Sequence, residues 1–283
     1  MSQSEAKRLR ERLNNELNRA TLDHCVKCTI CEQSCPVAAV TPLFSGPKFV
    51  GPQAERFRDG DSVDHSVDYC SSCGTCTVVC PQGVKVAELN SLARAVMKAE
   101  HGVPVRDRLI TQTTLMGKAM TPVAPVANAV LGNSAARKVM EMVVGVAASA
   151  PMPTAHSRTL KGWLKRRPAP TKAPTRGQVV FFHGCAGGYF ETEAAICGIE
   201  VLEHVGFDVV VPDQGCCGLA EQSNGLFEQA SGSVRKLVGQ LRTPRTDVPI
   251  VSTAGSCGGM LKHEAHEILG LDDPDLLDVG RRT

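Results

Sequence analysis

The sequence predicts a multidomain protein in which a mostly α-helical domain is followed by an α/β domain with a parallel sheet. Two cysteine motifs of identical spacing lie within residues 1–101, among segments with helical apolar periodicity. From residue 179 onward, short apolar runs alternate with helix-like segments, which is the pattern of βαβ units. A length of 283 residues is enough for two modest hydrophobic cores.

The composition excludes several classes of protein. The net charge is only +2 and aromatic residues make up 4%, which argues against nucleic-acid binding. Cysteine is the outlier, with 13 residues. Residues 1–20 are highly charged and lack the apolar segment of a signal peptide, so a secreted disulfide scaffold is disfavoured and clustered thiols indicate metal. The longest apolar stretches, such as 142–150, are too short to span a bilayer.

The first predicted domain covers residues 1–101. Leu9, Leu13 and Leu17 recur every four residues, as on an amphipathic helix. The run "VAELNSLARAVMKAEHG" after the second cysteine motif predicts another helix, and four of its apolar residues share one face: Leu89, Leu92, Val96 and Met97.

The two cysteine motifs are "CVKCTICEQSCP" at 25–36 and "CSSCGTCTVVCP" at 70–81. Each reads Cys-x-x-Cys-x-x-Cys-x-x-x-Cys-Pro. Structural zinc usually takes two separated Cys-x-x-Cys pairs, whereas this run is the one found in bacterial ferredoxins. Two copies predict a helical ferredoxin domain with two 4Fe–4S clusters, and zinc or buried thiols are the alternatives.

The fourth cysteine of each motif is expected to ligate the other motif's cluster, as in two-cluster ferredoxins. One cluster then takes Cys25, Cys28, Cys31 and Cys80. The other takes Cys70, Cys73, Cys76 and Cys35. Pro36 and Pro81 turn the chain after the last ligand. The small residues at the second motif are suited to donating backbone N–H bonds to cluster sulfurs: Ser71, Ser72, Gly74 and Gly83.

Residues 102–178 are predicted to connect the two domains. Few charges and many Ala, Val and Met in 102–150 predict one or two apolar helices, interrupted by Pro122 and Pro125. Residues 151–178 form a proline-rich basic segment that contains the single Trp163. We expect a solvated linker there, and the alternative is a contact with anionic lipid, because basic residues beside tryptophan suit a membrane surface.

Residues 179–283 are predicted to form the α/β domain, with right-handed crossovers between parallel strands. The expected strands are 179–182, 208–211 and 249–253, and the expected helices are 190–205, 226–241 and 259–269.

A second set of cysteines follows the three predicted strands, each beside glycine: Cys185, Cys216, Cys217 and Cys257. The carboxyl ends of parallel strands meet at one sheet edge, so we expect a metal or redox site there. Burial of these thiols as ordinary core residues is the alternative. Cys197 is expected in the core. His183 is expected to be a packing histidine, with hydrogen bonding to a ligand thiol as the alternative.

With both cysteine sets placed, the sequence resembles the C subunits of anaerobic glycerol-3-phosphate dehydrogenase. The resemblance rests on the twin Cys-Pro runs, "FFHGC", "CCG", "SGPKFVGPQAERFRDG" and "TLMGKAMTPVAPVAN", and it covers nearly all of residues 20–270. Heterodisulfide reductase subunits, the glycolate oxidase iron–sulfur subunit and a fumarate reductase subunit are more distant in pattern.

The resemblance implies an electron-transfer subunit with no catalytic residue of its own. A separate flavoprotein would oxidise glycerol 3-phosphate, and this subunit would pass the electrons through its clusters to menaquinone, on the cytoplasmic face of the inner membrane. The family's pattern maps onto all eight ferredoxin cysteines, and onto the second set as a possible third cluster. No nucleic acid is implied as a partner.

Two departures from the family pattern stand out. The cysteine-rich signature ends in Cys-x-x-Cys, but Met260 occupies the last position here. Members usually carry a second cysteine-rich (CCG) module, whereas this sequence ends at "DVGRRT" after one. A subunit of one of the related complexes, or a redox-sensing scaffold module, is therefore kept as the alternative function.

Overall fold

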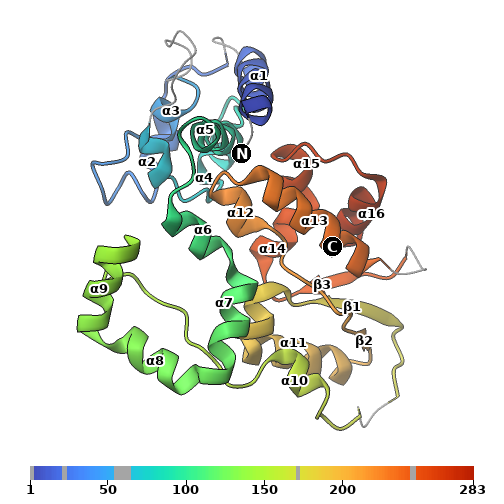
Figure 1. Ribbon diagram of the computed structural model, residues 1–283. Coiled ribbons are helices and arrows are strands. Elements are labelled where there is room, and N and C mark those ends of the chain that lie inside the picture. The colour runs from blue at the N-terminus through green and yellow to red at the C-terminus, as the bar shows by residue number, and fades with distance from the viewer. Residues whose placement is uncertain (1–2, 21–23, 54–64, 170–172, 243–246) are drawn as a thin grey trace. The chain divides into compact units, whose positions relative to one another are not determined.

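The structure, a computed structural model, describes residues 3–20, 24–53, 65–169, 173–242 and 247–283 (Figure 1). Two compact units are present. The first comprises Met1–Pro104 with Glu221–Glu228, and the second comprises Val105–Ala220 with Gln229–Thr283. Residues 54–60 of the stretch "SGPKFVGPQAERFRDG" and Lys172 of the basic segment lie outside the described residues.

The first unit is helical, as the sequence predicts. Its elements are α1 (Gln3–Ala20), α2 (Ile30–Gln33), α3 (Pro47–Val50), the short turn η2 (His65–Tyr69), α4 (Thr75–Val78) and α5 (Val86–His101). Helix α1 packs along α5 (Figure 1). Leu9 and Leu13 of α1 are buried, at 4% and 0% exposure, which confirms the amphipathic pattern expected for them.

Helix α5 is the centre of this unit. The predicted apolar face is buried, and Leu89, Leu92 and Val96 are at most 3% exposed. Arg94 and Lys98 are buried as well, because α1, α3, α4 and η2 pack on α5 from several sides. A helix that supports this many neighbours has no solvent-facing side along its middle turns, which the amphipathic pattern did not predict.

The second unit begins with a series of helices that precede its sheet in the chain. They are α6 (Val105–Thr111), α7 (Thr113–Met120), the turn η3 (Thr121–Val123), α8 (Ala124–Gly132), α9 (Ser134–Val144) and α10 (Leu160–Leu164). The prediction of one or two helices in 102–150 is therefore wrong, since the described residues there form α6 to α9. Prolines begin η3 and α8, and the Asn133 side chain caps α9 by accepting from the N–H groups of Ala135 and Ala136 at 3.0 Å.

The predicted parallel sheet is confirmed. Its strands are β1 (Gln178–Phe182), β2 (Asp208–Val210) and β3 (Ile250–Ser252), in the order β2-β1-β3 with both pairings parallel. The remaining elements are η4 (Ala186–Phe190), α11 (Thr192–His204), α12 (Leu219–Ser223), α13 (Phe227–Leu241), α14 (Gly255–Gly259), η5 (Met260–Glu264), α15 (Ala265–Glu267) and α16 (Pro274–Arg282). Strands β2 and β3 pair with opposite edges of β1. Right-handed crossovers between these parallel strands then put α11 and the second-unit part of α13 on opposite faces of the sheet.

One core of the second unit joins α10, β1 and α11. Leu160, Phe181 and Ile199 are fully buried in it, and Trp163 packs against them. The guanidinium of Arg167 lies over the Trp163 ring, 4.9 Å from its centroid, and pairs with Glu203 at 2.8 Å. The prediction of a solvated linker is wrong for residues 160–167, because this part of the basic segment folds onto the α/β core.

Candidate metal centres

The two cysteine motifs share an unusual backbone conformation. Lys27 and Thr29 of the first motif have φ of 60° and 64°, and the equivalent Ser72 and Gly74 of the second have φ of 54° and 78°. Left-handed residues are rare outside glycine. Alternation with right-handed residues turns successive N–H groups inward and forms concavities that bind anions, including iron–sulfur clusters. Both motifs therefore fold as matching thiol-lined loops.

Cys25, Cys28, Cys31 and Cys80 line one cavity of the first unit. Three of them come from the first motif and the fourth from the end of the second. Burial raises the pKa of the Cys31 thiol, and the nearby carboxylate of Glu32 adds to this effect. Lys48 also lines the cavity and pairs with Glu32 at 2.9 Å, so it places a positive charge beside the thiols.

The other thiols of the motifs gather around Cys70. Burial raises the pKa of Cys70, and the negative charges of Cys35 and Cys73 raise it further. Burial, together with the charges of Cys70 and Cys73, raises the pKa of Cys76 to about 12. Cys35, Cys70, Cys73 and Cys76 therefore lie close enough to interact electrostatically.

Backbone N–H groups already point at several of these sulfurs. Those of Ala38, Ser72 and Val84 donate to the Sγ atoms of Cys35, Cys70 and Cys80 at 3.5, 3.4 and 3.3 Å, respectively. The Ser72 bond is one of those expected from the sequence. Hydrogen bonds to the ligand sulfurs are one means by which a protein tunes an iron–sulfur cluster.

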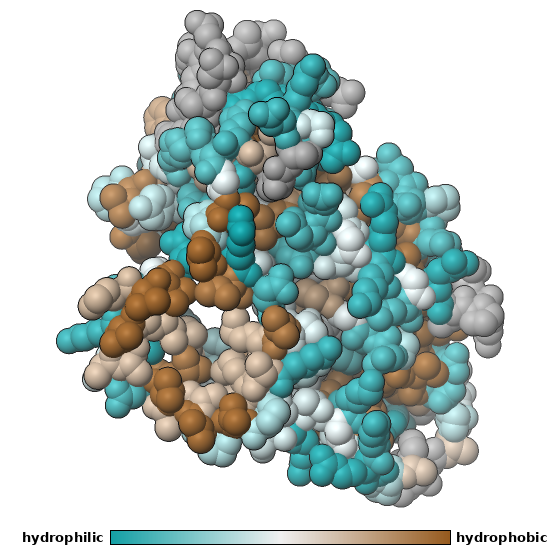
Figure 2. Space-filling model, in the orientation of Figure 1, coloured by the Kyte–Doolittle hydropathy of each residue, from teal (hydrophilic) through white to brown (hydrophobic). Residues whose placement is uncertain are grey.

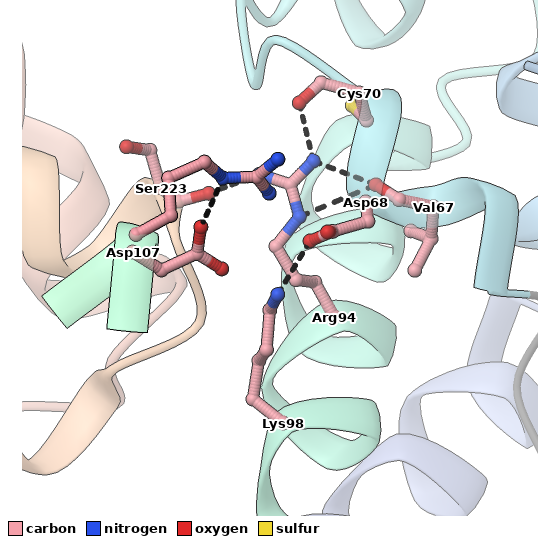
Figure 3. A network of polar contacts seen from close by, with 8 residues as sticks. Val67, Asp68, Cys70, Arg94, Lys98, Asp107 and Ser223 are labelled. Atoms are coloured by element: carbon pink, nitrogen blue, oxygen red, sulfur yellow. Dashed lines mark hydrogen bonds and ion pairs between the residues drawn. The ribbon is translucent and has the colours of Figure 1, made fainter. Parts of the chain in front are cut away.

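A buried arginine next to these loops was missed by the sequence analysis. Arg94 of α5 donates to the main-chain carbonyls of Val67, Cys70 and Ser223, while Lys98 pairs with Asp68 at 2.7 Å (Figure 3). Arg94 therefore fixes the backbone at a predicted ligand. The sequence did contain one indication of this role. Arg94 is a charged residue within the apolar part of a predicted helix, and such a residue is rarely buried without partners.

The second cysteine set converges at the carboxyl edge of the sheet. The Sγ atoms of Cys185 and Cys216 are 3.7 Å apart. Hydrogen bonding links Cys217 to both Cys216 and Cys257. The sequence expectation that three strands deliver thiols to one place therefore matches the arrangement in the second unit.

Hydrogen bonds couple the pKa values of the four thiols. The bond between Cys185 and Cys216 raises the pKa of Cys185 and lowers that of Cys216. Hydrogen bonding to Cys216 and then to Cys257 raises the pKa of Cys217, and the bond with Cys217 lowers that of Cys257. Together the four thiols form a donor set that a soft cation would bind after their protons leave.

Glycines allow this convergence. Gly184 has φ of +59°, and a Cβ there would lie 3.4 Å from the Cys257 sulfur. Gly218 has φ of +82°, and a Cβ there would lie 2.8 Å from the Ala230 carbonyl oxygen. The N–H of Gly218 donates to Cys216 Sγ at 3.4 Å.

The other residues singled out from the sequence lie near or away from this set. Met260 is fully buried one turn after Cys257. Burial lowers the pKa of His183, which keeps the ring neutral, and its Nδ1 lies 2.6 Å from the Gly184 carbonyl oxygen. Cys197 is exposed, so its expected core position is wrong. The core face of α11 carries Ala195 and Ile199, two residues to either side of it.

The donor chemistry of both regions fits iron–sulfur clusters. Every donor is a thiol, and the backbone turns and N–H bonds at the twin motifs favour bound anionic sulfur. Within the described ranges, no three or more His, Cys, Asp or Glu side chains are grouped so as to hold a single metal ion.

The fold and these thiol sites define the class: an iron–sulfur electron-transfer protein. Residues 21–84 match the model of the 4Fe-4S dicluster domain, and residues 179–262 match that of the cysteine-rich domain named CCG. Two clusters therefore belong to the N-terminal domain, and the CCG domain fits a possible extra cluster. No solved structure matches the chain significantly.

Curated relatives narrow the class. The chain is 32% identical to the C subunit of anaerobic glycerol-3-phosphate dehydrogenase from Escherichia coli K12, over 93% of this chain and 67% of the relative. It is 24% identical to a probable glycolate oxidase iron-sulfur subunit of Bacillus subtilis, over 97% and 65%, and 23% identical to the D subunit of a heterodisulfide reductase from Methanosarcina barkeri, over 70% and 46%. The chain belongs to the family of anaerobic glycerol-3-phosphate dehydrogenase C subunits, and it is an iron–sulfur subunit of the kind found in dehydrogenase and reductase complexes.

Proposed function

We propose that this subunit carries electrons from a flavoprotein that oxidises glycerol 3-phosphate to quinone in the membrane. The observation that carries the proposal is the mixed origin of the thiols in the first unit. Cys80 of the second motif lines the cavity of Cys25, Cys28 and Cys31, and Cys35 of the first motif acts electrostatically on Cys70. Interleaved ligands hold two clusters close together, which is what an electron relay requires.

The proposed ligands follow from this arrangement. One cluster is bound by Cys25, Cys28, Cys31 and Cys80, and the other by Cys70, Cys73, Cys76 and Cys35. When bound, the clusters supply one-electron oxidation and reduction at potentials set by hydrogen bonds, burial and charge. The protein's own contribution is to orient the thiolates, to donate N–H bonds to them through residues such as Ser72, and to limit the access of water.

A third cluster is proposed at the CCG domain. Cys185, Cys216, Cys217 and Cys257 supply four thiols there, which is enough for a cubane without a fifth ligand at Met260. An electron would then leave the ferredoxin pair for this site. The alternative, a redox-sensing scaffold, is supported by the 3.7 Å contact of Cys185 with Cys216, because two such thiols are also placed to form a disulfide on oxidation.

The membrane contact is proposed at the helices before the basic segment. Along α7, α8 and α9, large apolar side chains are exposed, among them Leu115 at 62%, Val126 at 64% and Met142 at 84% (Figure 2). Among the described helices, none combines the length and the hydrophobicity that a membrane-spanning segment needs. A peripheral position on the cytoplasmic face of the inner membrane is consistent with these exposed apolar side chains.

The proposal that glycerol 3-phosphate is the electron donor rests on the relatives, whose names include glycerol-3-phosphate dehydrogenase, glycolate oxidase and heterodisulfide reductase subunits. The test is to purify the chain anaerobically from its host, identify the attached flavoprotein, and follow cluster reduction with glycerol 3-phosphate, glycolate or lactate. We expect bleaching of the cluster absorption with glycerol 3-phosphate alone. Bleaching only with glycolate or lactate would assign the chain to a related complex.

A further inference from the structure

The second unit contains a cavity beside the proposed third cluster site, and Cys185 belongs to both. Its volume is about 560 Å³, within the range of about 300–1,000 Å³ typical of small-molecule sites. His183, Gly184 and Cys185 line it after β1, and Val211 to Gly215 line it after β2. The chain leaves β1 toward α11 and leaves β2 toward α13, on opposite faces of the sheet. The cavity therefore lies at the topological switch point, where open α/β sheets bind ligands.

The charge of this cavity is strongly positive. Four lysines line it, contributed by α7, α10 and α13 and by the residue after α10: Lys118, Lys161, Lys165 and Lys236. Among the described residues of the lining, the one carboxylate is that of Asp213, which pairs with Lys161 at 2.8 Å. Three positive charges of the described lysines remain after that pairing.

The polar groups at the inner end are already in use. The Gln214 amide donates to the Phe181 carbonyl and accepts from the His183 N–H, both at 2.9 Å. The side-chain Oε1 of Gln240 accepts from the Gly215 N–H at 2.9 Å. These hydrogen bonds hold the residues at the inner wall of the cavity in place. The groups left to meet a ligand include the ammonium groups and the hydroxyls of Thr114 and Tyr189, all of which can donate hydrogen bonds.

The cations of this cavity suit a compact anionic group. The described lining holds lysines and no arginine, and lysine binds phosphate as a compact point charge. Leu164, Val211 and the Tyr189 ring provide an apolar wall for the carbon part of a ligand. From these features we infer that the cavity between the ends of β1 and β2 binds a phosphate monoester, with the phosphate among the lysines and Cys185 beside it.

The test uses the full-length chain, purified anaerobically, and phenyl phosphate as the probe. Inorganic phosphate lacks the carbon part and phenol lacks the charge. Calorimetry should give the tightest binding for phenyl phosphate, weaker binding for inorganic phosphate and none for phenol. The double variant Lys118→Gln/Lys236→Gln should bind phenyl phosphate at least about tenfold more weakly, because each charged hydrogen bond contributes about 1.5 kcal/mol or more.

The matched control is Arg235→Gln/Lys262→Gln, which removes two exposed positive charges of the same unit outside the cavity. Its affinity should stay within about twofold of wild type, since distant surface charges are screened. Equal weakening in both double variants, or no saturable binding of either phosphate by the wild type, would overturn the inference. Iron content is measured alongside, so that loss of a cluster is distinguished from loss of the anion site.

A second arm separates free phosphate esters from lipid headgroups. Vesicles of phosphatidylcholine with phosphatidic acid are compared with phosphatidylcholine alone. Retention on the phosphatidic acid vesicles that is lost in Lys118→Gln/Lys236→Gln, but not in the control pair, would identify a lipid as the source of the phosphate. Equal retention of wild type and both variants, together with binding of phenyl phosphate, would identify a soluble ester.

Discussion

The Nη2 atom of Arg94 donates to the main-chain carbonyl of Val67 at 2.6 Å, and its Nε donates to the same oxygen at 3.2 Å. The same guanidinium contacts the carbonyls of Cys70 and Ser223, and the residue is only 5% exposed. One buried side chain thus ties α5 to the loop that carries the first thiol of the second motif, and to residues 221–228.

Replacing Arg94 by methionine should destabilise the first unit. The variant keeps the apolar stem of the side chain but leaves buried carbonyls without donors, and each such group costs about 1–3 kcal/mol. We expect a loss of about 3 kcal/mol in unfolding free energy, together with weaker cluster retention at Cys70. Arg8→Met, at an exposed position of α1, is the control and should change stability little. Equal denaturation midpoints for wild type and Arg94→Met would contradict this role.

Two glycine-to-alanine substitutions in the second unit should have opposite effects. In Gly218→Ala, the new Cβ would meet the Ala230 carbonyl at 2.8 Å with φ at +82°, so we expect a loss of about 2 kcal/mol and less metal bound at Cys216 and Cys217. In Gly232→Ala, nothing lies within 4 Å of the Cβ on α13, and removing a helical glycine should stabilise by up to about 1 kcal/mol. Thermal denaturation of both variants measures this, and a Gly218→Ala protein as stable as wild type would refute the proposed close approach.

The acid stability of the second unit should depend in part on Asp278. The Asp278 carboxylate accepts hydrogen bonds from Arg281 at 2.8 Å and from the buried Arg282 at 2.9 Å. These bonds lower the pKa of Asp278, and the bond from Arg281 has the largest effect. A carboxylate whose pKa is lower in the folded state stabilises fully above its unfolded pKa, near 4, and loses this contribution as the pH falls through the folded value.

Asp278→Asn should therefore be less stable than wild type at neutral pH. The difference between the two melting temperatures should shrink as the pH is lowered below about 4, where the wild-type carboxylate also becomes neutral. Melting temperatures measured across this range test the prediction. A difference that is unchanged by pH would show that the charge of Asp278 does not contribute.

The exposed apolar surface of α9 offers a test of membrane contact. Val139, Met142 and Val143 are 59%, 84% and 76% exposed. Changing all three to serine should weaken flotation with lipid vesicles by at least about tenfold, since burying each apolar side chain contributes about 1.5 kcal/mol or more. Val201→Ser, at an exposed position of α11, should have no effect. Unchanged flotation of the triple variant would place the contact elsewhere.

The parts of this protein that sequence predicts well are those with local periodicity or fixed ligand spacing. The runs at 179–182, 208–211 and 249–253 form β1, β2 and β3 within two residues, because buried parallel strands are short and apolar throughout. The convergence of Cys185 with Cys216 followed from the shared edge of a parallel sheet.

The features that depend on tertiary packing were not predicted. Residues 160–167 look like a solvated basic segment, yet Leu160 and Trp163 pack on the α/β core. Cys197 looks like a core residue in an apolar run, but the register of α11 exposes it. The carbonyls that satisfy Arg94 come from residues 67, 70 and 223, so no local pattern could reveal them.

The central claim is that the twin motifs hold two iron–sulfur clusters with ligands exchanged between them. The most direct measurement is the iron and acid-labile sulfide content of the anaerobically reconstituted chain, compared with Cys28→Ala and, as a control, Cys197→Ala at an exposed thiol outside both sets. We predict a brown protein that loses about four iron atoms per chain in Cys28→Ala and none in Cys197→Ala. A colourless, iron-free wild type, or unchanged iron in Cys28→Ala, would contradict the account.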